Sequence, residues 1–417
     1  MAHDVQQDYL AVSARLDVPD EAQMRAAITG AGLGAASFVA GGGRPAVGLV
    51  TRRRVGAFQV TGSRVPVTAE IVMYRYDDAM THGMGDQTFL RLTHGLAPAE
   101  VLIMREGSLV YDIRVTTSDA VATQGVFWAF HLARVVAQAC DGIVLDPGAQ
   151  RCLAPGAMAS MAVERPETHI TLHDEVWAAD RRWLHTHGVQ KYGQPEIDLR
   201  DVPTPLAREA REVLRQVVGS LTQGFTLRTG QQVLIEGTTP LITITAPTDM
   251  DHQAGTGRLT LVDAPTPSEM DAQSPRECLA TLALGEARQL LAQGNITTAL
   301  ATIERVLTAL PDDSAALSLK ATLAMRAGNY LEALAQGELM EMRSPGDYRG
   351  PLACATALAA MSRFPEALGE INQALHLEPE AQECFALRAE IYARMGDSRQ
   401  AAEDRSHAAY LRHYAAR

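Results

Sequence analysis

The last third of the chain repeats with a period of 34 residues, and this repeat restricts the fold more than any other feature of the sequence. The repeat stays in register from about Ala280 onward without an insertion. It has four columns: a first small residue, a turn residue, a second small residue and a proline. The columns are Ala287, Ala321, Ala355 and Ala389; Gly294, Gly328, Ser362 and Gly396; Ala299, Ala333, Ala367 and Ala401; and Pro311, Pro345 and Pro379. A fixed period of this length is typical of folds built from stacked supersecondary units.

The columns predict pairs of antiparallel helices. A small residue on each helix lets the two helices of a pair approach closely, and glycine adopts a turn conformation that a residue with a Cβ atom resists. Proline lacks an N–H and disfavours helix at the residue before it, so it ends the second helix. Large apolar residues such as Leu290, Tyr330 and Phe364 fill the space between helices. We therefore expect four helical hairpins.

This pattern resembles the tetratricopeptide repeat family over residues 280–417, about a third of the chain. The resemblance implies helix pairs stacked into a right-handed superhelix that binds a protein or peptide in its concave groove. The lysine and asparagine clamp that binds chaperone tails in part of the family is absent here. The family's inward-facing positions map onto a partner-binding groove of Arg288, Leu291, Thr322, Met325, Arg326, Arg349, Leu352, Thr356, Glu390 and Arg394.

The arginines of this groove have two interpretations. Arg288, Arg326, Arg349 and Arg394 can act as forks for acidic or carboxylate groups on a partner. They can equally be ordinary surface arginines, which are solvated and interact weakly. The sequence leaves both interpretations open.

Composition narrows the class of protein. With 37 basic and 49 acidic residues the net charge is −12, which speaks against a nucleic-acid partner because phosphate contacts require a basic face. The most apolar long stretch, Val126–Cys140, is too short to span a bilayer, so no membrane partner is expected. The five cysteines are widely spaced and form no CxxC pair, which favours reduced thiols and a cytoplasmic location.

The fold class predicted for the N-terminal two-thirds is α+β, an antiparallel sheet with helices, followed by the C-terminal all-α tetratricopeptide-like superhelix. Between Asp263 and Pro275 three prolines and three acidic residues indicate a linker. The expected domains are an α+β domain at 1–155, a second α+β domain or an extension of the first at 156–264, a linker at 265–279, and four repeats at 280–417.

Local patterns predict individual elements of the α+β region. Helices are expected at residues 20–30, 121–139 and 204–218, and strands at 46–50, 65–76, 109–115, 143–145, 168–172, 232–236, 241–246 and 258–262. We also expect a strand at Val101–Arg105, a hairpin turn at Glu106–Ser108 and a helix at Glu175–Leu184.

A cluster of histidines is the main candidate for chemistry. Four of the twelve histidines lie within the nineteen residues from His169 to His187. His185 and His187 share one face of an extended segment, where two imidazoles can chelate a metal. One hypothesis is a zinc or iron site made by His173, Glu175, His185 and His187. The other is a structural turn in which histidine and tryptophan side chains hydrogen-bond the backbone.

Other motifs of catalysis are missing from the sequence. There is no dinucleotide-binding fingerprint, P-loop, G-x-S-x-G elbow or HExxH helix, and Gly188 breaks the HxHxDH pattern of metallo-hydrolases. We therefore predict no catalytic residue and no cofactor apart from the metal hypothesis.

A second resemblance concerns the α+β region. The string Trp183-Leu-His-Thr-His-Gly188, with Pro195 and Glu196 after it, resembles a family of bacterial domains of uncharacterised function. The stretch Asp141–Pro147 is similar to the same family. The resemblance implies a bacterial origin and no particular activity.

Two functions follow from these patterns. The first is a bacterial cytoplasmic adaptor or scaffold, not an enzyme, that binds a protein partner through the groove of the repeats. The alternative is a metal-dependent hydrolase or ligand sensor that uses the His169–His187 cluster, while the repeats recruit the substrate. An arrangement in which the N-terminal region occupies the groove also stays open.

Overall fold

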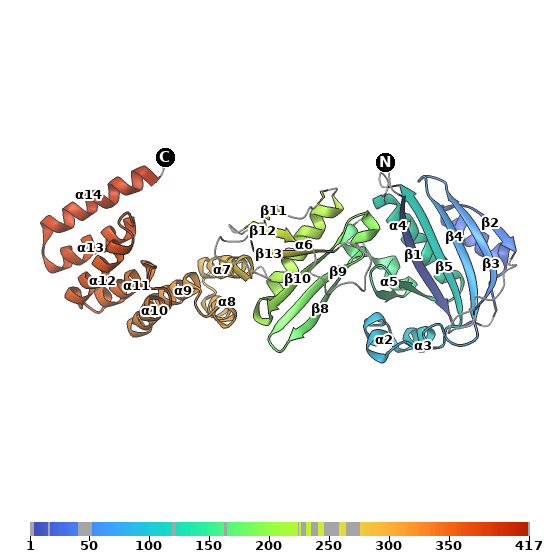
Figure 1. Ribbon diagram of the computed structural model, residues 1–417, viewed down its shortest axis with the longest axis horizontal. Coiled ribbons are helices and arrows are strands. Elements are labelled where there is room, and N and C mark those ends of the chain that lie inside the picture. Colours follow the sequence, from blue (N-terminus) through green and yellow to red (C-terminus); the bar gives the residue numbers. More distant parts are fainter. Residues whose placement is uncertain are drawn as a thin grey trace. The chain divides into compact units, whose positions relative to one another are not determined.

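The computed structural model of the protein describes residues 4–15, 17–40, 52–118, 122–161, 165–223, 225–226, 231–234, 241–245, 258–263 and 276–415. The chain divides into two compact units, and Figure 1 labels their elements. The first unit comprises Met1–Asp201, Arg211–Ile235 and Ile242–Ser274, and the second comprises Val202–Ala210, Glu236–Leu241 and Pro275–Arg417. Every described helix is too short or too polar to serve as a membrane span.

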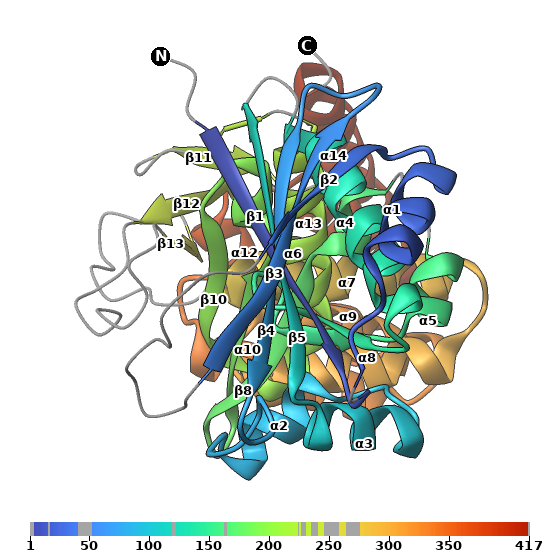
Figure 2. The same cartoon turned by 90° about the vertical axis from the view of Figure 1, so that its right-hand side faces the viewer.

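The described residues of the first unit form a seven-stranded sheet in which all neighbouring strands run antiparallel (Figure 2). Its strands are β1 (Asp4–Ser13), β2 (Gly34–Ala40), β3 (Arg52–Gly62), β4 (Thr68–Tyr76), β5 (Leu109–Ser118), β6 (Ile143–Asp146) and β7 (Arg151–Leu153). Their order is β2-β3-β4-β5-β1-β6-β7, so the first strand of the chain lies inside the sheet. The antiparallel α+β architecture expected for this region is confirmed.

Helices cover both faces of this sheet around β1. They are α1 (Glu21–Gly30), α2 (Asp86–Leu92), α3 (Pro98–Glu106), α4 (Ala122–Ala139) and α5 (Pro155–Ser160). Side chains alternate along a strand, so Tyr9 and Ala11 pack with α1 and α4 in one core. Val12 points to the other face and packs with Phe89 and Met104 of α2 and α3.

A second sheet, with six strands in the described part of the chain, lies mainly in the same unit. It has the order β11-β12-β13-β10-β9-β8. Its strands are β8 (Thr171–Ala178), β9 (Arg181–His187), β10 (Glu196–Pro203), β11 (Gln232–Leu234), β12 (Leu241–Thr245) and β13 (Arg258–Asp263). Among the described residues, η2 (Pro166–His169) precedes β8, η3 (Val189–Tyr192) lies between β9 and β10, and η4 (Thr204–Leu206) lies between β10 and the helix α6 (Ala207–Thr222). Arg211 of α6 forms an ion pair with Asp174 of β8.

Two local predictions are wrong. Val101–Arg105 belongs to helix α3, because Pro98 starts the helix and the Glu100 carboxylate accepts a hydrogen bond from the Ala97 N–H at 2.8 Å. Glu106–Ser108 therefore joins a helix to a strand and is no hairpin turn. Glu175–Leu184 is not helical: its residues form the β8–β9 hairpin, in which cross-strand pairing outweighs the helix propensity of the alanines at its tip.

Several expectations lie outside the described residues. The strand predicted at 46–50 and residues 265–275 of the linker expected at 265–279 belong to this group. The first repeat helix begins at Arg276, four residues before the expected start of the repeats, so residues 276–279 of the expected linker are helical.

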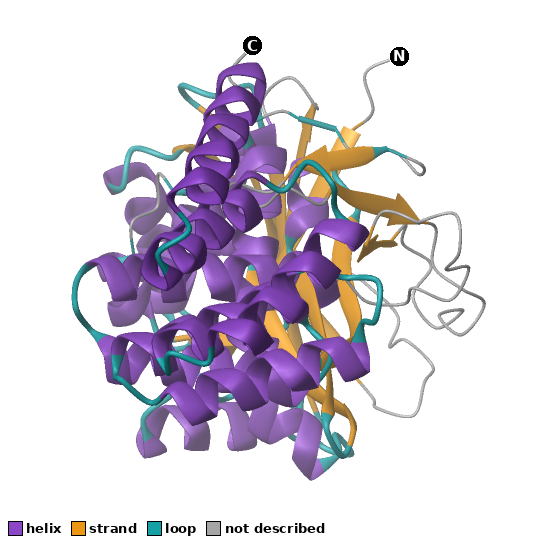
Figure 3. Cartoon of the chain, turned by 90° about the vertical axis from the view of Figure 1, so that its left-hand side faces the viewer, coloured by secondary structure: helices purple, strands orange, loops and turns teal. Residues whose placement is uncertain are grey.

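The second unit contains four consecutive helix pairs, as the repeat predicts (Figures 1 and 3). The first helices of the pairs are α7 (Arg276–Ala292), α9 (Ser314–Arg326), α11 (Arg349–Ala360) and α13 (Gln382–Met395). The second helices are α8 (Ile296–Ala309), α10 (Tyr330–Arg343), α12 (Phe364–Leu377) and α14 (Ser398–Ala415). Residues 276–415 thus form a tetratricopeptide-like array.

The repeat columns have the roles that their chemistry predicts. All eight alanines of the two small-residue columns are buried, each at most 4% exposed. The four turn residues adopt the left-handed conformation, including Ser362 with φ of 62°, which carries a Cβ atom. The residues before the three prolines leave helical geometry and end α8, α10 and α12.

The first helix pair also contacts the segment Val202–Ala210 of its own unit. Arg305 of α8 donates hydrogen bonds to the buried Glu209 carboxylate at 2.9 and 3.2 Å and to the Pro205 carbonyl at 2.8 Å. Arg208 pairs with Glu286 of α7. These contacts fix the start of the array to a segment that precedes it in sequence.

Gly337 tests the close approach of α10 and α11. A Cβ atom at Gly337 would lie 2.5 Å from Cys354 Sγ and 2.8 Å from the Cys354 nitrogen. We expect Gly337→Ala to lower the free energy of unfolding, because overpacking costs about 1–3 kcal/mol against a helix-propensity gain of about 1 kcal/mol. Gly369→Ala on α12, where a Cβ atom meets open space, should raise stability by up to about 1 kcal/mol. Urea unfolding followed by helical circular dichroism measures both, and equal effects of the two variants would contradict the close packing.

Candidate functional site

A small cavity lies between α9 and α11, the first helices of the second and third repeats. Its volume is about 160 Å³. Its lining comes from these two helices alone: Ser318, Ala321, Thr322, Met325, Arg349, Leu352, Ala353 and Thr356. This is the helix set that the family register assigns to the concave face.

The structure brings half of the predicted groove residues together in this cavity. Five of them line it: Thr322, Met325, Arg349, Leu352 and Thr356. The other five lie on α7, α9 and α13 and are not part of its lining: Arg288, Leu291, Arg326, Glu390 and Arg394. Ala321 and Ala353 are not among the predicted groove residues, although their short side chains leave the space open; Ala321 is predicted only as a member of the first small-residue column.

The cavity offers apolar groups more than polar ones. The Thr322 hydroxyl donates to the Ser318 carbonyl at 2.9 Å, and the Thr356 hydroxyl donates to the Leu352 carbonyl at 2.7 Å. These donors are used within their own helices, so the threonines present methyl groups and acceptor oxygens. Met325 and Leu352 add a thioether and an isobutyl group. The surface suits an aliphatic side chain.

Two of the four groove arginines are engaged inside the array. Arg349 forms a two-pronged ion pair with Asp347, at 2.9 and 2.7 Å, and donates to Ser314 Oγ at 2.8 Å. The hydrogen bond to Asp347 raises the pKa of Arg349. Arg394 donates to the Ala359 carbonyl at 2.9 Å and lies over the Phe364 ring. These two guanidinium groups connect neighbouring repeats.

The predicted metal-binding residues also meet, on the β8–β9 hairpin. His173 lies directly opposite His185, while Glu175 lies opposite Trp183 and Thr171 opposite His187. Because side chains alternate along a strand, His173, Glu175, His185 and His187 share one face of the hairpin. One ligand atom from each of His173, Glu175 and His185 lies within 4.8 Å of the other two.

The four imidazoles of the cluster have different environments. The His187 ring lies 4.8 Å from the His173 ring and 4.9 Å from the His185 ring, centre to centre. His173 and His185 are buried. His169 is separate from this group, because it is fully buried against Phe127 and Phe130 of α4.

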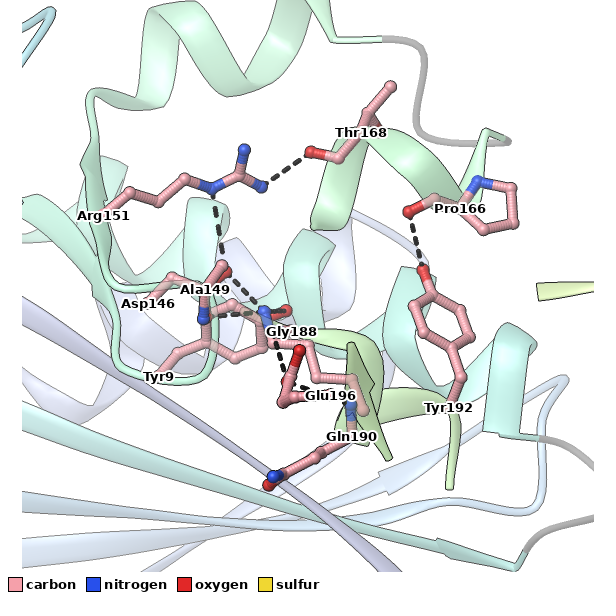
Figure 4. A network of polar contacts seen from close by, with 11 residues as sticks. Tyr9, Asp146, Ala149, Arg151, Pro166, Thr168, Gly188, Gln190, Tyr192 and Glu196 are labelled. Carbon is pink, nitrogen blue, oxygen red and sulfur yellow. Dashed lines mark hydrogen bonds and ion pairs between the residues drawn. The ribbon is translucent and has the colours of Figure 1, made fainter. Parts of the chain in front are cut away.

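The short helix η3, which follows β9, contributes to a buried ion pair (Figure 4). Lys191 of η3 contacts both carboxylate oxygens of Asp146 at 2.5 Å, and its ammonium lies 4.8 Å from the centre of the Tyr9 ring. Asp146 is fully buried at the end of β6 and also accepts a hydrogen bond from the Ala149 N–H. Burial lowers the pKa of Lys191, an effect that the Asp146 carboxylate opposes.

The Glu196 carboxylate holds the backbone at the end of β9 and in the turn that follows it. Its carboxylate accepts hydrogen bonds from the Gly188 N–H at 2.8 Å and from the Thr186 hydroxyl at 2.7 Å. Gly188 has φ of 107°, and a Cβ atom there would lie 2.8 Å from the His169 carbonyl oxygen, so glycine is required. Lys191 lies between Gly188 and Pro195, so its ion pair with Asp146 joins this turn to the end of β6.

Sequence analysis did not identify this ion pair. Two signals could have found it: Lys191 is one of only two lysines in the chain, and Asp146 ends an apolar run of three residues. A lysine or an aspartate is rarely buried in an apolar interior unless it is paired with an opposite charge.

Comparison with solved structures finds likenesses over about a third of the chain. A thermophilic TPR protein of Thermus thermophilus is 25% identical over 32% of this chain and 74% of its own, with a TM-score of 0.30. MamA MSR-1 is 20% identical over 33% of this chain and 78% of its own, with a TM-score of 0.27. No protein-family model matches the sequence, and a search of curated proteins finds no match. At such TM-scores, the tetratricopeptide-like description of α7–α14 rests on the chain's own repeat and helix pairs.

The ion pair predicts a large and specific effect on stability. Lys191→Met leaves the Asp146 carboxylate buried without its ammonium partner, so we expect a loss of about 3–5 kcal/mol in the free energy of unfolding. Adding Asp146→Asn removes the buried charge and should recover part of that loss. All three tryptophans lie in the first unit, so urea unfolding followed by tryptophan fluorescence reports on it.

Arg25→Met is the matched control for Lys191→Met. It breaks the half-exposed pair of Arg25 and Glu21 within α1, and we expect a loss below about 1 kcal/mol. A similar loss for Lys191→Met and Arg25→Met would show that the buried pair does not hold this unit together.

Proposed function

We propose that this protein is an adaptor that binds another protein through the concave face of its tetratricopeptide-like array, in the cytoplasm of a bacterium. The observation that carries the proposal is the cavity between α9 and α11, lined by five residues that the family register assigns to the groove. The five buried, unbridged cysteines support a reducing compartment.

The size and chemistry of the cavity favour a peptide over a small molecule. Small-molecule sites typically measure about 300–1,000 Å³, and this cavity measures about 160 Å³. It accommodates one aliphatic side chain of an extended segment that runs along the first helices. Arg349 and Arg394 already bind groups within the array, so they are poorly placed to bind a carboxylate of the partner. An apolar side chain of the partner fits this surface better.

Thr322 and Thr308 form a matched pair for testing this face. Both are exposed helical threonines whose hydroxyl groups donate to the carbonyl four residues earlier, but Thr308 lies on α8 and does not line the cavity. A photo-crosslinking residue placed at Thr322 in the full chain should capture a partner that the same residue at Thr308 does not.

The partner identified in this way allows a quantitative test. Thr322→Glu places a longer charged side chain at the cavity, and we expect it to weaken binding at least tenfold, because a desolvated apolar contact is lost. Thr308→Glu should leave the dissociation constant unchanged within a factor of two. Calorimetric titration of the purified proteins measures both values. Equal binding by the two variants, or equal crosslinking at the two positions, would refute a partner site on the concave face.

A further inference from the structure

The histidine face of the β8–β9 hairpin has no part in the proposed function, and its side chains form a donor set. We propose that His173, Glu175 and His185 bind one Zn²⁺ ion, with His187 as a fourth ligand. The inference stands on the hairpin alone and is independent of the partner site on the repeats.

The hairpin register accounts for the convergence of these side chains. Directly opposed residues of an antiparallel pair have Cβ atoms about 5 Å apart, and His173 and His185 are such a pair. Their rings stack with centres 5.3 Å apart and an angle of 12° between planes. Glu175 is two residues from His173 on the same strand, so its carboxylate lies on the same face of the hairpin, beside the two imidazoles.

The donor atoms need only a small adjustment to bind a metal. Zinc takes imidazole nitrogen and carboxylate oxygen at about 2.0–2.2 Å in tetrahedral geometry, which puts two ligands about 3.4 Å apart. The three donor atoms now lie within 4.8 Å of one another. Rotation of the His173 and Glu175 side chains toward His185 closes this difference without a change of register.

The number and kind of donors favour zinc over calcium or magnesium. Three imidazoles and one carboxylate make a nitrogen-rich set, whereas calcium and magnesium prefer all-oxygen sites. The His187 ring approaches both other rings of the set within 4.9 Å. Two strands thus supply two ligands each, and a bound ion would crosslink β8 to β9.

Trp183 holds one of the ligands in position. Its ring lies 3.9 Å from the His185 ring, centre to centre, and its indole N–H donates to the buried Asp198 carboxylate at 3.1 Å. Because the orientation of a metal-binding histidine depends on its supporting contacts, Asp198 and Trp183 favour a fixed ring over a mobile one.

Arg91 would compete with the metal ion for the Glu175 carboxylate. The Arg91 guanidinium on α2 donates to the Glu175 carboxylate at 2.8 Å. A bound ion would take this oxygen and would also be repelled by the neighbouring positive charge. Removing Arg91 should therefore strengthen metal binding, which is a response that scattered surface histidines would not give.

The first experiment is calorimetric titration of the tag-free full chain with Zn²⁺ after treatment with EDTA. We expect one ion per chain with a micromolar or tighter dissociation constant at pH 7.5. At pH 5.5 the affinity should fall at least tenfold, because protonated imidazoles cannot bind the metal. Co²⁺ in place of Zn²⁺ should give the visible absorption of a tetrahedral site.

The variants assign the ion to this face. His185→Gln and Glu175→Gln should each weaken Zn²⁺ binding at least tenfold, and Arg91→Met should strengthen it several-fold. His94→Gln, at an exposed histidine of the same unit, should change nothing. Glu175 is partly exposed, so its variant keeps the test valid if replacement of the buried His185 prevents folding.

Three results would overturn the inference. One is the absence of a stoichiometric binding event in the wild-type chain. Another is equal affinity in wild type and Glu175→Gln, which would place the ion elsewhere. The third is a loss of binding in His94→Gln, which would identify adventitious binding by surface histidines.

Discussion

In the second unit, small side chains set how closely the helices approach one another. Eight alanines in two columns are buried where the helices of the array contact one another, and Gly337 allows α10 to approach Cys354 of α11. Close packing of this kind makes a core intolerant of added atoms. Small side chains also create the proposed partner site, because Ala321 and Ala353 leave open the space between α9 and α11 that larger residues would fill. The stability of this unit and the proposed binding therefore both depend on its small residues.

The first unit depends on a different kind of contact. Lys191 and Asp146 are 45 residues apart in sequence and belong to segments of two different sheets, yet their charged groups meet in the interior. Two charges removed from water are tolerated only when they satisfy one another. The pair and the Glu196 carboxylate also hold the turn that follows β9, which places His185 and His187 at the end of a strand whose register is fixed. The structural interpretation of the His-Thr-His string and the proposed metal site are therefore compatible, since a rigid hairpin is what a preorganised donor set requires.

Elements that are specified by residues close together in the chain could be predicted from the sequence. The alanine, glycine and proline columns specify helix pairs within 34 residues, and all four pairs are present. In the α+β region the helix at 121–139 and the strands at 109–115 and 143–145 were likewise identifiable, since they are long or strongly apolar. The first strand was not, because Gln6, Gln7 and Asp8 interrupt its apolar pattern and its ten-residue pairing with β5 lies more than ninety positions away. The prediction for Glu175–Leu184 failed for a related reason: its alanines and charges suit a helix, whereas the hairpin depends on the pairing of β8 with β9 along both strands. The donor set could be listed from the sequence, but the Arg91 contact with Glu175 and the internal engagement of Arg349 depend on the folded chain.

The contacts of Arg305 with Pro205 and Glu209 have a consequence for how the array can be isolated. A solenoid exposes the unpaired side of its end repeats unless another segment covers it. At the N-terminal end that cover is η4 and the first residues of α6, where Leu206 is fully buried. A fragment opened at Arg276 would lose this cover, since the covering residues lie some seventy positions upstream. The array and the segment that covers its first repeat are not contiguous in sequence, so a fragment that begins at α7 lacks that cover.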